Sequence, residues 1–149
     1  GSVASLPFVT KGITDTLESV PASRVINAIP FYTRVWYEDS LENAPEGSII
    51  VEDPMNGDYA LSSRAVGMGA GEKLIKQNNG SVRWLEDLGQ NYGEFYTSDG
   101  RFGRVWLEDK QSLEAKLNVM KENNLAGVAC WKLGLESEEA WDAIGEFLK

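Results

Sequence analysis

The stretch Gly127–Gly134, GVACWKLG, poses the central question about the fold. Its first four residues are small and apolar, as in a β-strand that is buried on both faces. A large Trp131 then stands beside the charged Lys132. A buried strand that ends in this way provides either a packing detail of the core or the floor of a ligand site.

A second segment of the same kind lies near the N-terminus. The run VINAIPFY, residues 25–32, is short and almost continuously apolar. This composition again predicts a strand covered on both faces. Pro30 should mark the end of the strand, because proline has no N–H to donate to a sheet.

Three predicted helices flank these strands. The first covers residues 6–20, where Pro7 suits the first turn, and Asp109 and Ser137 can cap the other two. The side chains expected to face the core are Val9, Ile13 and Leu17, then Leu113, Leu117 and Met120, then Trp141, Ile144 and Leu148. Helices that alternate with buried strands are typical of an α/β fold with parallel strands.

Residues 37–105 differ from the rest of the chain in composition, with frequent Pro and Gly and closely spaced predicted turns. A strand is predicted in GSIIVED, a helix over 63–78, and a three-stranded meander in SVRWLED, YGEFYT and RFGRVWLE. Asp99-Gly100 is a strong hairpin turn. Two parallel strands do not form a stable sheet alone, so we interpret the outer parts as pieces of a larger α/β fold and the middle as an insertion.

The composition excludes several classes of protein. The chain has 149 residues and a formal net charge of −9, from 14 basic and 23 acidic side chains, which argues against nucleic acid and anionic membranes as partners. It has no histidine, which removes His-based triads and zinc sites. With a single cysteine, Cys130, the chain cannot contain a disulfide framework. We interpret Cys130 as a small core residue. We predict neither a metal nor a cofactor site.

Two further motifs favour ordinary structural roles. GMGAGEK at 67–73 resembles a phosphate-binding loop, but its glycines are too close together and Leu74 stands where Ser or Thr is needed. We therefore interpret it as a glycine-bearing helix packed closely on a sheet.

Pairs of adjacent carboxylates also occur in the chain. A glycosidase holds two carboxyl groups across a sugar, and adjacency in sequence does not show that arrangement. We therefore interpret the adjacent carboxylates as solvated turn or cap residues. They are Glu38-Asp39, Glu52-Asp53, Glu86-Asp87 and Glu108-Asp109.

Aromatic residues cluster at the ends of the two apolar strands, and Arg34 accompanies them. They are Phe31, Tyr32, Trp36, Trp106 and Trp131. Ligands of parallel α/β sheets bind beyond the C-terminal ends of the strands. Aromatic faces with a guanidinium group suit sugar rings, whose C–H groups stack on the ring and whose hydroxyls accept hydrogen bonds. The alternative is a core cluster, which composition alone favours.

VINAIPFYTRVW at 25–36 and VWLEDKQSLEAKLNVMKENNLAGVACWKLGLE at 105–136 resemble the C-terminal part of glycoside hydrolase family 18, in its bacterial chitinase-like branch of spore-cortex and cell-wall N-acetylglucosaminidases. GSVASLPFV and RAVGMGAGEKLI extend the resemblance over essentially the whole chain. The resemblance implies an α/β fold, the C-terminal portion of a (β/α)8 TIM barrel. Residues 25–31 and 127–131 would be its seventh and eighth strands. Segments 1–36 and 105–149 would belong to the barrel, and 37–104 would be an α+β insertion subdomain.

The catalytic signature of that family, D-x-x-D-x-D-x-E, is absent from the chain, as is its M-x-Y-D segment. The family uses a substrate-assisted retaining route in which a glutamate protonates the leaving oxygen. The resemblance thus implies no catalytic residue here, and we expect the chain alone to be inactive. It implies substrate-binding roles for Trp131, Arg34, Tyr32, Trp36 and Glu136. The alternative is a non-catalytic carbohydrate-binding or interaction module.

The expected partners follow from the same resemblance. They are a polysaccharide that contains N-acetylglucosamine, such as peptidoglycan, and the upstream remainder of the barrel. Without that remainder the parallel strands leave apolar faces bare, so we expect the fragment to form a homodimer or to swap elements with another copy. The resemblance also implies a secreted, cell-envelope or spore-surface location.

Overall fold

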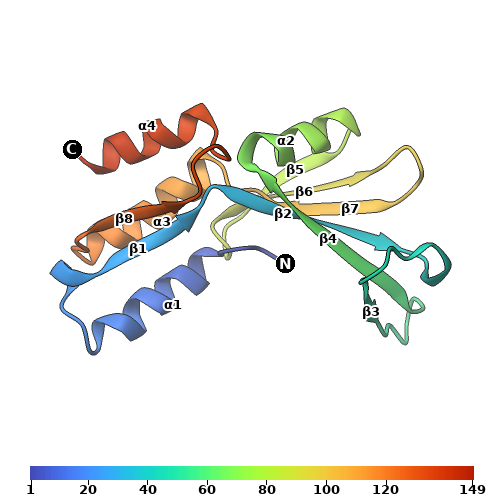
Figure 1. Cartoon of the computed structure of the whole chain (residues 1–149), viewed down its shortest axis with the longest axis horizontal. Helices are drawn as coiled ribbons and strands as arrows, with labels where there is room; N and C mark the ends of the chain where they lie inside the picture. Colours follow the sequence, from blue (N-terminus) through green and yellow to red (C-terminus); the bar gives the residue numbers. More distant parts are fainter.

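The computed structural model describes residues 1–149 and arranges the strands in two sheets (Figure 1). In chain order the elements are α1 (Leu6–Leu17), η1 (Ala22–Arg24), β1 (Ile26–Pro30), β2 (Tyr32–Asp39), η2 (Leu41–Asn43), β3 (Ile49–Val51), β4 (Tyr59–Gly67), α2 (Met68–Gln77), β5 (Ser81–Leu85), β6 (Gln90–Tyr96), β7 (Phe102–Trp106), α3 (Lys110–Glu122), β8 (Gly127–Trp131) and α4 (Glu138–Phe147). One sheet contains β1 and β8, and the other has the order β3-β4-β2-β7-β6-β5. No helix combines the length and apolar character that crossing a membrane requires.

The two apolar segments form a parallel pair, as predicted for 25–31 and 127–131. Ile26 lies opposite Gly127 at one end, and Pro30 lies opposite Trp131 at the other. β1 ends at Pro30, as its missing N–H predicts. The expectation that both faces are covered is wrong for this chain. The helices cover one face, whereas on the other Ile26 is 63% and Trp131 is 67% exposed.

The covered face of this sheet rests on α1, α3 and α4. Most of the side chains predicted to face the core are buried there, among them Val9 and Ile13 of α1 and all three of α3. The prediction for α4 holds for Ile144 but is wrong for Leu148, which lies beyond the end of the helix and is 72% exposed. Trp141 is 46% exposed, and its ring and that of the buried Phe31 form a T-shaped pair at a centroid distance of 5.5 Å. α1 ends at Leu17, before the predicted end at residue 20.

Asp109 caps α3 in a reciprocal capping box. Its Oδ1 accepts from the backbone N–H of Ser112 at 2.9 Å, and the Ser112 hydroxyl accepts from the backbone N–H of Asp109 at 3.0 Å. Each such bond satisfies a donor that has no partner within the helix, and a cap of this kind is worth about 1 kcal/mol. Ser137 occupies the N-cap position of α4 as predicted, but its side chain makes no capping hydrogen bond.

The six-stranded sheet is antiparallel throughout, and β5, β6 and β7 confirm the predicted meander. The turn between β6 and β7 contains Gly100 with φ +86°, as Asp99-Gly100 predicted. The helix predicted over 63–78 is wrong in its first part. Residues 59–67 form β4, which pairs with β2 along its length, and α2 begins only at Met68. Pairing with a strand distant in sequence therefore decides the conformation of residues 63–67.

Gly71 brings α2 close to the sheet, which confirms the interpretation of GMGAGEK as a glycine-bearing helix. A Cβ atom at Gly71 would lie 2.9 Å from Cγ2 of Thr33 and 3.0 Å from Cδ2 of Leu107. Both neighbours are buried, so neither side chain can move aside into solvent. The helix can pack this closely against Thr33 and Leu107 only because residue 71 has no side chain.

We expect Gly71→Val to lower the free energy of unfolding by about 1–3 kcal/mol, because the added atoms overpack this contact. Urea unfolding at constant pH measures the change. Gly69→Val is the matched control in the same helix, since a Cβ atom at Gly69 would have no neighbour within 4 Å. Equal losses in both variants would show that the helix does not depend on close approach at Gly71.

The buried apolar side chains form two separate clusters. The first lies between the parallel strands and α1, α3 and α4, and the second lies between α2 and the six-stranded sheet. Two carboxylates interpreted as solvated are in fact buried: Glu108 is 1% and Asp39 is 7% exposed. Each has a cationic partner that the sequence did not reveal, Lys116 for Glu108 and Arg101 for Asp39. Glu52, Glu86 and Asp87 are exposed, as interpreted.

Candidate functional site

Only Phe31 separates β1 from β2, and the chain bends there as it passes from one sheet into the other (Figure 1). Side chains alternate along the two strands. Ile29, Phe31, Thr33 and Val35 are all buried against the helices. The residues between them therefore lie on the opposite side, which no helix covers. The uncovered sides of the two sheets are thus continuous with each other, and we call this the open side.

Trp131 lies on the open side at the C-terminal end of β8. Its partner in register is Pro30, and its carbonyl oxygen accepts from the backbone N–H of Phe31 at 2.7 Å. The residue is therefore fixed at the point where β1 passes into β2. Its side chain is 67% exposed, which is unusual for a tryptophan that only fills a core.

Tyr32, Arg34 and Trp36 follow one another along the open side of β2. All three are half-buried, whereas the residues between them are fully buried. The sequence left open whether Tyr32 points to the core, and the alternation of β2 turns it to the open side. It lies opposite Gly67 in the register of β2 with β4, and a Cβ atom at Gly67 would lie 2.9 Å from the carbonyl oxygen of Leu135.

Arg34 is held in place without an acidic partner. Its Nη1 donates to the hydroxyl of Ser63 at 2.7 Å, and its guanidinium carbon lies 6.0 Å from the ring centroid of Trp36. It takes part in none of the ion pairs of the chain. In a protein with a net charge of −9, such a guanidinium keeps donors free for hydroxyl or carbonyl oxygens.

Trp36 has a more constrained position. Its indole N–H donates to the carbonyl oxygen of Gly1 at 2.8 Å, so the N-terminal residues lie against this part of the open side. Arg104 lies opposite Trp36 on β7 and forms an ion pair with Glu38. The sequence did not identify Ser63, Arg104 or Glu38 as neighbours of the site. The register of β2 with β4 and β7 brings Ser63 and Arg104 there, whereas Glu38 lies on β2 itself, two residues beyond Trp36.

Glu136 supports the loop that follows Trp131. Its Oε2 accepts from the backbone N–H groups of Gly134 at 2.6 Å and Leu135 at 3.0 Å. A hydrogen bond from its own backbone N–H, followed by those from Gly134 and Leu135, holds the pKa of the carboxyl below its ordinary value. The carbonyl of Leu135 in turn accepts from Met68 N at 2.9 Å, which ties the loop to the start of α2. The carboxylate therefore orders the loop beside Trp131.

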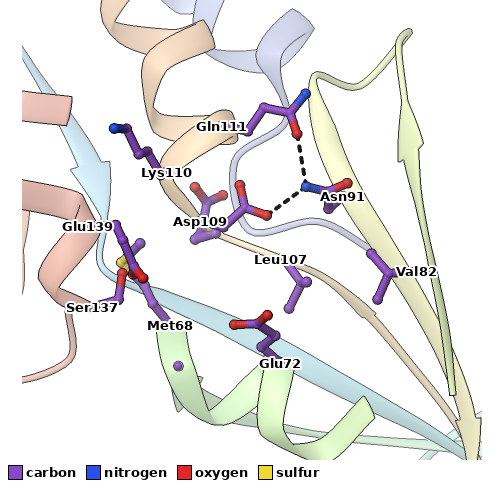
Figure 2. A pocket seen from close by; sticks show the side chains of 12 residues that line it. Met68, Glu72, Val82, Asn91, Leu107, Asp109, Lys110, Gln111, Ser137 and Glu139 are labelled. Carbon is purple, nitrogen blue, oxygen red and sulfur yellow. Dashed lines mark hydrogen bonds between the residues drawn. The ribbon is translucent and has the colours of Figure 1, made fainter. Parts of the chain in front are cut away.

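Two pockets of the chain differ in whether a predicted substrate-binding residue lines them, and only one of the two includes such a residue. One, of about 680 Å³, includes Arg34, Ser62, Ser63 and Arg101 in its lining. The other, of about 360 Å³, lies on the helix-covered side near the N-terminal ends of α2, α3 and α4, and Asn91 there donates to Asp109 and Gln111 (Figure 2). None of the five predicted substrate-binding residues lines this second pocket. No group of three or more Cys, Asp or Glu side chains is placed to hold a metal ion.

The comparisons with known proteins point to one class, the enzymes that cleave glycosidic bonds. No protein-family model matches the chain. The cortical fragment-lytic enzyme of Bacillus subtilis is 30% identical over 112 residues, which are 70% of this chain and 26% of that enzyme. Chitinase B of Serratia marcescens is 27% identical over 135 residues, 81% of this chain and 27% of the chitinase. The spore cortex-lytic enzyme SleL of Bacillus megaterium has the same fold over 100% of this chain and 31% of its own, with a TM-score of 0.79 and 22% identity.

The chain belongs to glycoside hydrolase family 18, which confirms the resemblance seen in its sequence. The homologues of the chain are cortical fragment-lytic enzymes, glycosylases and chitinases, and its fold is the α/β fold of chitinase-like structures. The chain spans only 20% to 26% of the length of the first three relatives. It therefore corresponds to a part of those enzymes.

Proposed function

We propose that this chain is the C-terminal part of a family 18 glycoside hydrolase, of the chitinase or peptidoglycan N-acetylglucosaminidase type, and that it supplies one wall of the sugar-binding cleft. In this proposal β1 and β8 are the seventh and eighth strands of a (β/α)8 barrel. Residues 1–36 and 105–149 belong to the barrel, and 37–104 form the insertion. The observation that carries the proposal is the open side, which joins Trp131 to Tyr32, Arg34 and Trp36 on one continuous surface.

Each residue has a binding role in this proposal. The exposed ring of Trp131 stacks on the apolar face of a sugar. Arg34 donates hydrogen bonds to hydroxyl or acetamido oxygens, since no carboxylate occupies its donors. Tyr32 and Trp36 extend the aromatic surface along β2, and Glu136 holds the loop next to Trp131. The residues that break the glycosidic bond are not among them, because the chain contains no D-x-x-D-x-D-x-E.

The unpaired edges of β1 and β8 support the proposal that further strands cover them in the complete protein. β1 pairs only with β8, so each strand has an unpaired edge, and Ile26 is exposed on the uncovered face. In a complete barrel the upstream strands cover these groups. In the isolated chain we propose that a second copy covers them, as a dimer or through swapped elements. Relatives named as cortical fragment-lytic and sporulation-specific enzymes support a spore-surface, cell-envelope or secreted location.

We expect the chain to bind N-acetylglucosamine oligomers and to leave them uncleaved. Trp131→Ala and Arg34→Ala should each weaken binding about tenfold, equivalent to about 1.4 kcal/mol, through loss of ring stacking and of charged donors. Titration calorimetry measures the affinity, and chromatography of the same samples detects any product. Leu133→Ala is the matched control, since Leu133 is 70% exposed two residues from Trp131.

Binding that survives both substitutions would place any sugar site elsewhere. Turnover that disappears when a carboxylate of this chain is replaced would overturn the claim of inactivity. Clear binding without any cleavage by the full-length protein would favour the second candidate, a non-catalytic carbohydrate-binding module. The exposure of Trp131 on an accessible surface supports that candidate equally.

A further inference from the structure

The two apolar clusters meet across a buried polar network. Leu107, directly after β7, belongs to the cluster under α2, and Leu117 of α3 belongs to the cluster under the parallel strands. The residues next to them, Glu108 and Lys116, both have fully buried side chains. An ion pair thus lies where one cluster ends and the other begins.

The pair is held by well-defined hydrogen bonds. Nζ of Lys116 lies 2.8 Å from Oε1 and 2.6 Å from Oε2 of Glu108. Gln90 donates from Nε2 to Oε1 of Glu108 at 2.7 Å, and the Ser112 hydroxyl donates to Oε2 at 3.2 Å. Gln90 also accepts from the hydroxyl of Ser2. The network therefore connects the starts of β6 and α3, the end of β7 and the N-terminal residues.

The chain passes between the two sheets at only two places, and the pair lies at one of them. The first passage is the single residue Phe31 between β1 and β2. The second is the segment Leu107–Asp109 between β7 and α3. Apolar contacts allow one layer to shift against another, whereas a buried ion pair with four directed hydrogen bonds is satisfied in one geometry.

We infer that Glu108 and Lys116 are positioning residues, which fix the orientation of the six-stranded sheet on the parallel strands and thereby the placement of Arg34 relative to Trp131. Trp131 belongs to the parallel pair and Arg34 to the six-stranded sheet, so a rotation between the sheets changes their separation. The consequence for sugar binding rests on the proposed function. The orientation itself does not depend on it.

Distances between spin labels test this inference directly. Thr14→Cys on α1 and Lys73→Cys on α2 place exposed labels on the helical layers of the two sheets, and Cys130→Ala removes the native thiol. Pulsed electron spin resonance then gives the distance distribution between the layers. A second pair, Thr14→Cys with Lys121→Cys, reports only on the layer beneath the parallel strands.

The decisive variant is Glu108→Leu with Lys116→Met, which removes both charges and keeps similar volume. We expect unfolding stability to be retained or raised, because apolar residues often replace a buried ion pair without loss. We expect the distribution between layers to shift or to widen about twofold, since apolar packing specifies orientation loosely. The Thr14–Lys121 distribution should remain narrow.

Lys110→Met with Glu114→Leu is the matched control on the same helix, because that ion pair is 3.6 Å apart and about 40% exposed. It should change neither distribution. If Glu108→Leu with Lys116→Met does not fold, Glu108→Gln with Lys116→Met takes its place with the same expected result. An unchanged narrow distribution between the layers in a folded variant would overturn the inference. Because no sugar is present, failure of the proposed function would leave these distances unaffected.

Discussion

Replacing Lys116 by Met is expected to lower the free energy of unfolding by about 3–5 kcal/mol at pH 8, since it leaves the Glu108 carboxylate buried and without its cation. Lys116 Nζ contacts both oxygens of Glu108, and both side chains are fully buried. The remaining partners, Gln90 and Ser112, are neutral and cannot compensate the charge. Urea unfolding monitored by tryptophan fluorescence measures the change.

The cost of Lys116→Met should be smaller at pH 5. Burial raises the pKa of Glu108 and the ion pair with Lys116 partly offsets that rise, so removing Lys116 raises the pKa further and keeps the carboxyl protonated over a wider pH range. At pH 5, below the pKa of about 7 that this carboxyl has in the native chain, protonation removes the charge that the variant would leave unpaired, whereas at pH 8 the variant must either bury that charge without its cation or protonate the carboxyl at a cost in free energy. Lys110→Met on the exposed side of α3 should cost less than about 0.5 kcal/mol at either pH. A loss of that small size in Lys116→Met would contradict the role of the pair.

Because of Glu108, the free energy of unfolding of the native chain is also expected to decrease as pH rises from about 4.5 to about 7. Burial raises the pKa of its carboxyl from 4.5 to about 7, although Lys116 and Ser112 act in the opposite direction and Asp109 adds to the rise. Over that window the folded state binds more protons than the unfolded state. The free energy of unfolding then decreases as pH rises, by at most about 1.4 kcal/mol per unit for one group.

Other carboxyl groups contribute in the opposite direction, so the comparison must isolate Glu108. Hydrogen bonds lower the pKa values of Asp53, Asp99 and Glu136, and their contribution is lost only as pH falls through the acid range. Glu108→Gln with Lys116→Met lacks both groups of the pair and retains this background. The difference between the native chain and this variant, measured by urea unfolding from pH 4.5 to pH 8, should decrease up to about pH 7 and then level off. A difference that is constant with pH would contradict the raised pKa of Glu108.

The sequence predicted the elements whose causes are local. The apolar runs of β1 and β8, the cap at Asp109 and the turn at Asp99-Gly100 depend on neighbouring residues, and all of them form as predicted. The first part of the predicted helix over 63–78 failed because its strand conformation depends on pairing with β2. The covered faces predicted for β1 and β8 failed for a related reason, since a run of apolar residues does not say whether the covering layer is in the same chain.

In the candidate site, too, the sequence predicted individual residues but not the neighbours that strand pairing brings to them. The sequence and the family resemblance singled out Trp131, Arg34, Tyr32 and Trp36, and the structure brings them to one side of the chain. Their neighbours Ser63 and Arg104 depend on strand register, which the sequence does not specify. Glu108 was predicted to be solvated because it is adjacent to Asp109 in the sequence. A signal was available in α3, where Ser112 and Lys116 directly precede the buried Leu113 and Leu117.

The pairing of β2 with β7 has a consequence for how such a chain can be altered. Val35 lies directly opposite Val105, so the strands by which the chain enters and leaves the six-stranded sheet are hydrogen-bonded neighbours, about 5 Å apart. The residues between Val35 and Val105 therefore form a segment, here called the cassette, whose two ends are adjacent in space. A short hairpin loop could close the chain in its place, and a cassette from a relative could be exchanged for it without lengthening either junction. The shape of the proposed cleft wall could thus be changed while the parallel strands and Trp131 keep their connections.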